Sequence, residues 1–326
     1  MTDYQRTRKA EAYPLAGRKL GVLGKGGAGK STVSVLLARE LSERGYEVFL
    51  LDADSTNVGL HRALGFHEAP APLLDVFGGM VFSGGAVTCP VDDPTPLPHS
   101  RLSPSDLPSS FIRKSSGQIS LLSGGKLGDL GPGAGCDGPI SKIARDVELK
   151  GETGKGVTVV DLKAGMEDLA RGVITSLDWA IAVVDPSAAA VHMAESLGRM
   201  VSQIRDGVPP ATAHLETPQQ VEMARKLFRE ARVNGVLAIL NRTADVTAEV
   251  ELAKKVSRLA SVELIGALRE DLAVGRAWFD GLSLRSPENK DRVRGMVSRI
   301  ETAERQATEH GAHTTAFRAA LDPVTP

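Results

Sequence analysis

The sequence predicts an α/β protein with a single doubly wound, mostly parallel sheet and helices on both faces. Three observations lead to this fold class. Short apolar runs alternate with amphipathic runs, a glycine-rich loop joins one such pair, and polar residues follow several apolar runs. The strands are expected at residues 20–23, 48–51, 119–122, 157–160, 180–184, 236–240 and 262–265. Since parallel strands end at the same rim of a sheet, the polar residues after them should share one crevice.

Amphipathic runs and helix-end signals predict the helices. The first is expected at 33–41, where Arg44-Gly45 ends it because glycine accepts the left-handed cap. Two more are expected at 140–149 and 188–204, and Thr217-Pro218 opens another that runs to Arg229, with proline at the first helical position. A polar helix over Asn289–His310 mixes charges without a strong apolar face, which argues against membrane binding through this helix.

These elements predict one large domain over residues 18–284, preceded by an extension over 1–17 and followed by a C-terminal helix and tail over 285–326. Residues 66–117 interrupt the alternation with many prolines, serines and paired glycines. Short strands or hairpin turns are expected around Val81–Val87. From Pro90 to Pro108 we expect a disordered linker in preference to a functional lid.

Composition excludes several classes of protein. The chain has 326 residues with 39 basic and 40 acidic side chains, so no global field attracts nucleic acid or an anionic membrane. Aromatic residues make up only 4%, which argues against stacking on single-stranded nucleic acid. Two cysteines do not form a disulfide scaffold. Residues 1–17 lack the apolar core of a signal peptide, and no apolar run is long enough to span a membrane. We therefore expect a cytoplasmic protein.

The glycine-rich loop follows the first predicted strand and opens the first predicted helix, the context of a phosphate-binding loop. Its glycines permit backbone conformations closed to other residues and let amide groups surround phosphate oxygens. Lys30 is expected to reach the β- and γ-phosphates, and the Ser31 hydroxyl to ligate Mg²⁺. The nucleotide-binding residues of the loop are Gly24, Lys25, Gly26, Gly27, Ala28, Gly29, Lys30, Ser31 and Thr32.

Three aspartates follow predicted strands and supply the remaining chemistry of phosphoryl transfer. Asp52 and Asp54 end one strand on alternate positions, so both can face the phosphates. We assign Asp54 to the attacking water, and Asp52 to the Mg²⁺ hydration shell or to Ser31. Asp161, after residues 157–160, is the expected second carboxylate for Mg²⁺.

The loop resembles that of the MinD, ParA and nitrogenase-iron-protein class of ATPases, which have a second lysine where this chain has Lys25. Two further stretches resemble the CooC family, ATPases that mature nickel carbon monoxide dehydrogenase. Residues 52–57 are similar to its Asp-Ala-Asp-Pro-x-x-Asn, and residues 161–172 to its Asp-Met-Glu-Ala-Gly-x-Glu-His-Leu-Gly-Arg-Gly. Val183–Ser187 and Asn241-Arg242 match its Val-Asp-Pro-Ser and Asn-Lys-Val, so the similarity covers most of residues 18–284.

The resemblance implies a P-loop ATP hydrolase that uses Mg²⁺ and dimerises with ATP. In that class, a lysine at the position of Lys25 reaches the nucleotide of the partner subunit and acts with Lys30 and Asp54 in catalysis. Asn241 would read the adenine edge, since an amide can both donate and accept. The stretch Lys163–Arg171 would be the switch that responds to the γ-phosphate, with Glu167, Asp168 and Arg171 as switch or dimer contacts.

The cysteines raise the question of a second metal. Cys136 lies where CooC proteins carry Cys-x-Cys, but Ala134 replaces the first cysteine. Two thiolates from each subunit there would suit Ni²⁺ or Zn²⁺ at the dimer interface. The same stretch resembles the segment of the nitrogenase iron protein that carries the first of its two cluster cysteines. Asp168 stands where that protein has the second cysteine, so a bridging Fe–S cluster would have only half of its thiolates. Cys136 is therefore either a soft-metal ligand or a small buried hydrophobe, and Cys89 adds a thiol only if the fold brings it close. The histidines have no metal-site spacing.

Three functions remain open at this point. The favoured one is a metallochaperone that couples ATP to maturation of a client such as a nickel carbon monoxide dehydrogenase. The second is an ATP-driven electron donor like the nitrogenase iron protein. The third is a positioning ATPase of the ParA or MinD kind.

Overall fold

The computed structural model describes residues 12–115, 117–127 and 136–321, with side chains described up to residue 310. Within this part, one eight-stranded sheet has the order β10-β9-β8-β1-β7-β2-β5-β4. All neighbouring strands pair in parallel except the edge strand β4 (Arg113–Lys114), which runs antiparallel to β5. The other strands are β1 (Lys19–Gly24), β2 (Glu47–Ala53), β5 (Ile119–Ser123), β7 (Gly156–Leu162), β8 (Trp179–Val184), β9 (Gly235–Thr243) and β10 (Val262–Arg269). The predicted fold class is confirmed, and each predicted strand is present.

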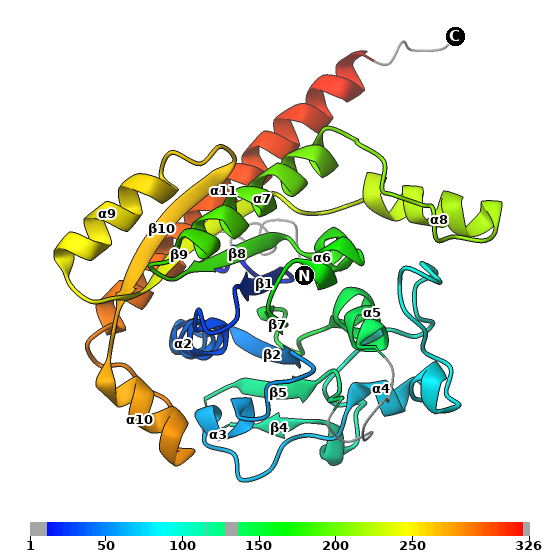
Figure 1. Ribbon diagram of the computed structural model, residues 1–326. Coiled ribbons are helices and arrows are strands. Elements are labelled where there is room, and N and C mark those ends of the chain that lie inside the picture. Colours follow the sequence, from blue (N-terminus) through cyan, green and yellow to red (C-terminus); the bar gives the residue numbers. More distant parts are fainter. Residues whose placement is uncertain (1–11, 116, 128–135, 322–326) are drawn as a thin grey trace.

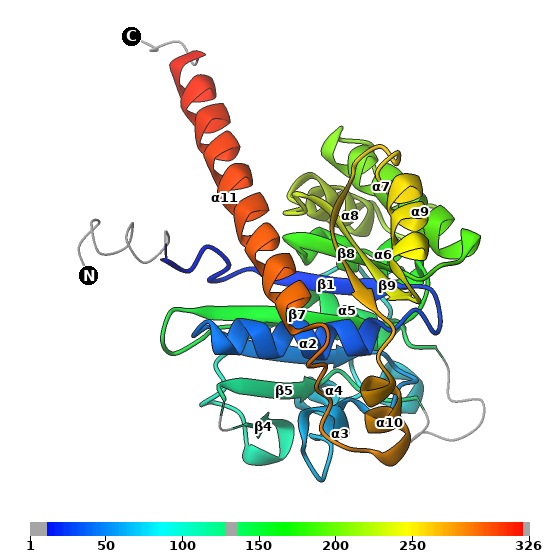
Figure 2. The same ribbon diagram turned by 90° about the vertical axis from the view of Figure 1, so that its left-hand side faces the viewer.

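Helices cover both faces of the sheet, and each face has its own apolar cluster (Figures 1 and 2). One layer holds α2 (Lys30–Glu43), α3 (Leu60–Leu64), α10 (Leu272–Asp280) and α11 (Lys290–Leu321). The other holds α4 (Leu73–Val76), α5 (Gly138–Asp146), α6 (Glu167–Ala170), η4 (Val173–Ser176), α7 (Ala188–Arg205) and α9 (Val246–Val256). The helix α8 (Pro218–Arg229) begins with the predicted cap, a capping box between Thr217 and Gln220.

The central strands are apolar on both faces because both are covered, as is typical of parallel sheets. In β2, Val48 and Leu50 pack with α2, whereas Phe49 and Leu51 pack into the opposite cluster. The pairing of β2 with β7 sets Asp52 beside Asp161 at the carboxyl ends of the two strands. The sheet thus delivers these two carboxylates to one rim, on the side from which α2 starts.

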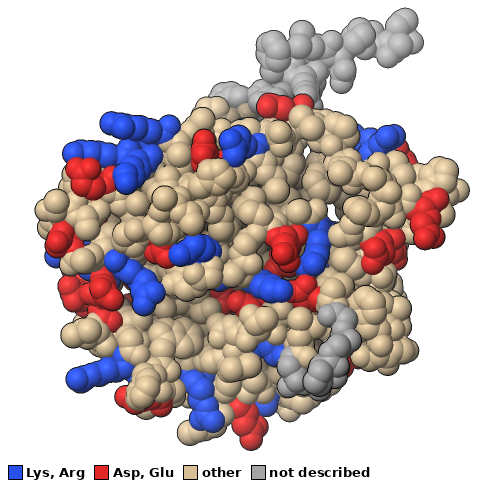
Figure 3. Space-filling view, viewed as in Figure 1, with Lys and Arg blue, Asp and Glu red and all other residues tan. Residues whose placement is uncertain are grey.

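Charged side chains are dispersed over the surface. On the face viewed in Figure 3, lysines and arginines lie among aspartates and glutamates without a large area of one sign. No described helix is long and apolar enough to cross a membrane.

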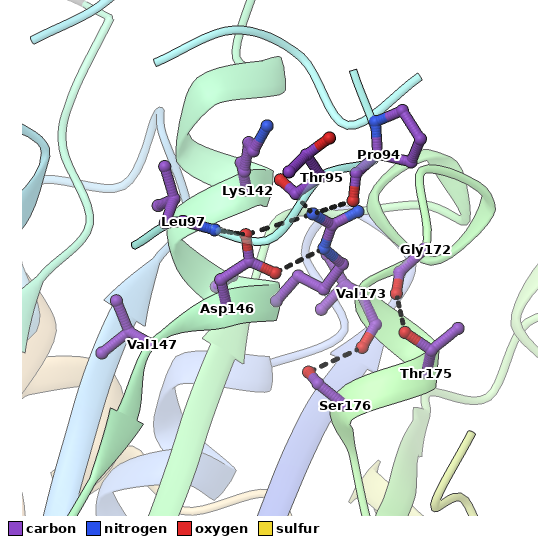
Figure 4. Close-up of polar contacts among 12 residues, drawn as sticks. Pro94, Thr95, Leu97, Lys142, Asp146, Val147, Gly172, Val173, Thr175 and Ser176 are labelled. Atoms are coloured by element: carbon purple, nitrogen blue, oxygen red, sulfur yellow. Dashed lines mark hydrogen bonds and ion pairs between the residues drawn. The ribbon is translucent and has the colours of Figure 1, made fainter. Parts of the chain in front are cut away.

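The segment Pro90–Pro108 is packed against the domain, so the expectation of a disordered linker is wrong. The Leu97 amide donates to Asp146 Oδ2 at 2.9 Å, and the Arg145 guanidinium donates to the Pro94 carbonyl at 2.9 Å (Figure 4). Two short strands, β3 (Arg101–Leu102) and β6 (Glu148–Leu149), pair in parallel. The prolines remove donors from this segment, but its carbonyls accept hydrogen bonds from the cations of α5.

Three smaller expectations also need correction. The helix predicted over 140–149 ends at Asp146, because the chain then turns extended into β6. Around Val81–Val87 the structure has the 3₁₀ turn η1 (Val81–Ser83) and an isolated bridge from Met80 to Val87, not a hairpin. The C-terminal helix extends beyond His310 to Leu321, and residues 322–326 lie outside the described part.

Despite its polar composition, α11 packs on the core through a narrow apolar stripe. Val293, Met296, Val297 and Ile300 are all at most 4% exposed. Their spacing of three and four residues places them on one side of the helix. The far end of α11 projects beyond the body of the domain (Figure 2).

Candidate functional site

A cavity of about 450 Å³ lies at the rim of the sheet, where the glycine-rich loop meets the ends of β2, β9 and β10. Its walls combine loop residues, polar strand-end residues and α10. The lining residues are Gly27, Gly29, Lys30, Ser31, Thr32, Leu36, Asp54, Asn57, Asn241, Arg242, Leu268, Arg269, Glu270, Asp271, Leu272, Val274, Gly275, Trp278 and Asn289. This cavity brings together most of the residues predicted to bind nucleotide.

The loop needs glycine at particular positions. Gly27 and Gly29 have φ of 79° and 91°, in the left-handed region. A Cβ at Gly29 would lie 2.2 Å from Asn241 Nδ2, and one at Gly24 would lie 2.7 Å from the Val183 carbonyl oxygen. The helix α2 begins at Lys30 with no side-chain cap, so the free N–H groups of its first turn are available to an anion.

Ser31 lies among polar partners at the ends of β2 and β7. Its hydroxyl donates to Asp161 Oδ2 at 2.6 Å and accepts from Asn57 Nδ2 at 2.7 Å. Ser34 donates to the other oxygen of Asp161 at 2.9 Å. Burial raises the pKa of Asp161 to about 6, even though the two hydroxyls and Lys30 act in the opposite direction. Asn57, which the sequence analysis did not assign to the site, is thus a direct neighbour of the predicted Mg²⁺ ligand.

Asp52 has a different partner from the one expected. Lys126, just after β5, forms an ion pair with Asp52 Oδ1 at 2.7 Å and also donates to the Asp54 carbonyl. Of the two roles expected for Asp52, the contact with Ser31 is made by Asp161 instead, and the role in the Mg²⁺ hydration shell stays a prediction. Burial raises the pKa of Asp52 to about 7, and the neighbouring charges of Asp161 and Asp54 add to this effect against Lys126.

Asp54 organises the turn after β2. Its Oδ1 accepts from the Thr56 amide at 2.9 Å, the Thr56 hydroxyl at 2.7 Å and the Asn57 amide at 3.2 Å. Asp54 lines the cavity and is 6% exposed. The same carboxylate therefore faces the cavity and fixes the position of Asn57, which in turn holds Ser31.

The two lysines of the loop lie in contrasting environments. Lys30 is buried and lines the cavity. Lys25 has a side chain 40% exposed and pairs with Asp185, at the end of β8, at 3.4 Å. In this structure of a single chain, Lys25 is thus turned toward its own subunit.

The end of β9 is bonded to the loop. Asn241 donates from Nδ2 to the Ala28 carbonyl at 2.7 Å, and Arg242, with φ of 59°, donates to the Gly27 carbonyl at 3.0 Å. Trp278 of α10 donates from Nε1 to the Thr32 hydroxyl at 2.9 Å. Asn241 lines the cavity, and its reading of adenine stays a prediction. No local motif marked Trp278 or Lys126, because both reach the site through long-range packing.

A second polar cluster surrounds Asp137, next to the predicted switch. Asp137 is 4% exposed and accepts from Ser55 at 3.1 Å, Arg171 at 2.7 Å and Lys163 at 2.5 Å. Although burial opposes it, the hydrogen bond and charge of Lys163, together with Arg171, hold the pKa of Asp137 below its usual value. One carboxylate therefore joins the segment after β2 to the segment after β7.

Asp168 belongs to the same polar cluster around Asp137. By the resemblance described above, it stands where the nitrogenase iron protein has its second iron–sulfur cysteine. It accepts from Ser141 at 2.7 Å and lies 3.4 Å from the Arg171 guanidinium. Glu167 is its more exposed neighbour, 3.9 Å from Arg171. The switch residues singled out from the sequence are thus joined to α5, whose first residues follow Cys136.

The two cysteines are unpaired, Cys89 buried and Cys136 partly exposed. Ala134 lies within residues 128–135, which are outside the described part of the chain. Among the residues that are described, no group of three or more histidine, cysteine or acidic side chains is arranged to hold a metal ion. A soft-metal site at Cys136 therefore stays a prediction.

Comparisons with known proteins agree with this geometry. Residues 22–284 match the family model of the CobQ/CobB/MinD/ParA nucleotide-binding domain. The carbon monoxide dehydrogenase accessory protein CooC of Rhodospirillum rubrum is 27% identical over 86% of this chain and 95% of its own. An uncharacterized ATP-binding protein of Methanocaldococcus jannaschii is 31% identical over 60% of this chain and 81% of its own.

Solved structures support the same fold. The cell division ATPase MinD of Pyrococcus furiosus superposes with a TM-score of 0.53 at 17% identity, over 88% of this chain and 99% of its own. A ParA family ATPase of Chlorobium tepidum gives 0.53 at 16%, over 88% and 98%. The family model covers most of the chain and includes both the glycine-rich loop and the strand-end carboxylates. This chain belongs to the CobQ/CobB/MinD/ParA family of nucleotide-binding domains, with the fold of the MinD and ParA ATPases.

Proposed function

We propose that this chain is a Mg²⁺-dependent ATPase that dimerises with ATP and serves as a metallochaperone in the maturation of a metalloenzyme, with nickel insertion of the CooC kind favoured. The observation that carries the proposal is the position of Asp137. It is bonded to the segments after β2 and β7, and it directly follows Cys136. The likeness to CooC over most of both chains supports the same reading.

The cavity residues fit a nucleotide with Mg²⁺. Loop amides and Lys30 hold the phosphates, while Ser31 and the carboxylates Asp161 and Asp52 offer the oxygen ligands that this cation prefers. Burial makes ionisation of these two carboxylates unfavourable, and a bound cation would favour their ionised forms. When bound, Mg²⁺ supplies neutralisation of phosphate charge.

Asp54 orients the attacking water, since it lines the cavity beside Lys30 and Ser31. Asn57 and Ser34 fix Ser31 and Asp161, so the hydroxyl and the carboxylate are held in place before substrate arrives. Lys25 leaves Asp185 and contacts the nucleotide of the partner subunit. The cost of this release is small because the pair is partly exposed.

A first experiment tests the nucleotide cycle. Lys30→Ala should abolish ATP binding, and Asp54→Ala should bind ATP without hydrolysing it. In sedimentation with ATP, Asp54→Ala should be a dimer, and the addition of Lys25→Ala should return it to a monomer. Unchanged turnover in Asp54→Ala, or a dimer indifferent to ATP and to Lys25, would contradict these roles.

A second experiment tests the link through Asp137. In wild-type protein, ATP should change the rate at which Cys136 is alkylated, because the nucleotide moves the segments that Asp137 joins. In Asp137→Asn the rates with and without ATP should converge. The matched control is Asp93→Asn. It removes a carboxylate that pairs with Lys142 of α5, the helix that Asp137 precedes, and ATP should still change the alkylation rate of Cys136 in this variant. An alkylation rate of Cys136 that is the same with and without ATP in the wild-type protein would refute the link.

The role in maturation is tested with a client. Purified chain, Ni²⁺ and Mg²⁺-ATP should activate nickel-free carbon monoxide dehydrogenase, and Lys30→Ala should not. An iron–sulfur chromophore in protein purified without oxygen, with no activation of the client, would favour the electron donor instead. Failure of both, with ATP-dependent positioning of a cargo, would favour a protein of the ParA or MinD kind.

A further inference from the structure

Lys126 lies in a loop that is bonded along the end of β2. The Gly124 amide donates to the Asp52 carbonyl at 2.8 Å, and the Leu127 amide donates to the Ser55 carbonyl at 3.1 Å. Because these two backbone bonds stand on either side of Lys126, they fix the position from which its side chain starts. The pairing of β5 with β2 therefore delivers this lysine to the carboxylate rim of the sheet.

The Lys126 side chain bridges two aspartates at this rim. It is only 16% exposed, and its ammonium donates to Asp52 Oδ1 at 2.7 Å and to the Asp54 carbonyl at 2.5 Å. Among the described residues, no hydrogen bond reaches the second carboxylate oxygen of Asp52, Oδ2. One oxygen of Asp52 is thus held by the protein, and the other is available to a ligand.

The charges around Asp52 explain why a cation is needed there. Asp54 and Asp161 lie close enough for their negative charges to act on Asp52, and the positive charge of Lys126 opposes them. A buried carboxylate without a partner is costly, so a neighbour must neutralise it. A buried ion pair by itself adds little net stability, because the desolvation of both groups offsets their attraction. The pair is therefore better explained by a task at the nucleotide site than by folding.

We propose that Lys126 is a positioning residue for the magnesium ion of the nucleotide: it holds Asp52 by Oδ1 so that Oδ2 faces the hydration shell of the cation. The same ammonium fixes the Asp54 carbonyl, at the turn that carries Asn57 to Ser31. This inference rests on the Mg²⁺-dependent nucleotide site proposed above. Groups that hold the carboxylate partners of a metal govern its affinity without touching it, and their loss commonly costs about 10–100-fold.

The test separates the contribution of the metal to nucleotide binding from that of the nucleotide itself. Full-length protein is titrated with adenylyl imidodiphosphate, an ATP analogue that is not hydrolysed, once with Mg²⁺ and once with EDTA. The ratio of the two dissociation constants reports what the metal adds. Lys126→Met keeps an apolar stem but removes the ammonium, and it should lower this ratio by about tenfold or more. Lys126→Gln, a second uncharged variant, should show the same loss, whereas Lys126→Arg keeps a cation and should retain most of the ratio.

Two comparisons show whether Lys126 acts through Asp52. Asp52→Asn should lower the ratio to a similar extent, and the addition of Lys126→Met should cause no further loss, because the two residues act as one unit. Lys142→Met is the matched control. It removes another buried ammonium, which is bonded to Asp93 outside the nucleotide cavity, and it should leave the ratio unchanged. Urea unfolding checks that each variant is folded.

The outcomes distinguish this inference from the proposed function. A wild-type ratio in Lys126→Met and Lys126→Gln would overturn the positioning role and leave the Mg²⁺-dependent site intact. Parallel weakening with Mg²⁺ and with EDTA would also overturn it, because Lys126 would then act on the nucleotide and not on the metal. Losses that add in the double variant would overturn the route through Asp52. A wild-type protein whose affinity is the same with Mg²⁺ and with EDTA would refute the Mg²⁺-dependent site and this inference together.

Discussion

Substitution of Gly29 by alanine should damage the phosphate loop in a way that the same change at Gly27 does not. Both residues have a left-handed backbone, so alanine costs about 1–2 kcal/mol of strain at either position. At Gly27 the added methyl meets no atom within 4 Å. At Gly29 it would lie 2.2 Å from Asn241 Nδ2 and must displace that amide.

The displacement breaks the buried hydrogen bond from Asn241 to the Ala28 carbonyl, now 2.7 Å long. Loss of a bond of this kind, with one partner left unsatisfied, costs about 1–3 kcal/mol. We therefore expect Gly29→Ala to lower the free energy of unfolding by about 2–5 kcal/mol and Gly27→Ala by about 1–2 kcal/mol. Urea unfolding without nucleotide measures both. Equal losses in the two variants would refute the argument that Asn241 and the loop fit together only through glycine.

Three further predictions follow from polar groups at the site and in the core. Burial raises the pKa of Asp52 to about 7 and that of Asp161 to about 6, so protons compete with Mg²⁺ as the pH falls. Calorimetric affinity for Mg²⁺-ATP should be highest above pH 7 and should decline as the pH drops through 7 to 6. Trp278→Phe should lose the 2.9 Å bond to Thr32 and weaken ATP binding several-fold in the same assay. Lys19→Met should lower the free energy of unfolding in urea by about 2–4 kcal/mol, because its buried ammonium donates to three backbone carbonyls at 2.6, 3.1 and 3.0 Å.

Each of these has a clear contrary result. Affinity for Mg²⁺-ATP that is flat between pH 6 and 8 would mean that neither carboxylate meets the cation. Trp179→Phe is the control for Trp278, since it loses a bond of 2.8 Å to Glu304 away from the cavity. Equal loss of ATP affinity in the two tryptophan variants would point to a general structural effect. Wild-type stability of Lys19→Met would mean that the three carbonyls find other partners.

Local patterns were enough to predict the sheet and most of the nucleotide cavity. The strands are continuous apolar runs because both faces are buried, and strand ends collect at one rim in any parallel sheet. The order of small and basic residues from Gly24 to Thr32 specified the loop, and the cavity does gather Lys30, Ser31, Asp54 and Asn241.

The partners of those residues could not be predicted, because they depend on which strands become neighbours. Lys126 reaches Asp52 only because β5 pairs with β2, a choice that no local pattern records. Asp137 likewise carries no sign of its three partners in the adjacent sequence. The packing of the Pro90–Pro108 segment could not be predicted for a related reason. Proline and serine predict a lack of regular structure, but an irregular chain can still pack firmly. Here Lys142 and Arg145 donate hydrogen bonds to its backbone carbonyls.

The two edges of the sheet bear on how copies of this protein associate. An exposed edge strand is a template for uncontrolled aggregation. Here β4 has only two residues, Arg113 and Lys114, and charged side chains discourage a further strand. At the opposite edge, β10 pairs with β9 through two register shifts, which bend the strand away from the flat geometry that a new strand requires. In the ATP-dependent dimer proposed above, subunits would therefore associate through side chains and not through backbone pairing at the sheet edges, so the contact could form and break in each round of turnover.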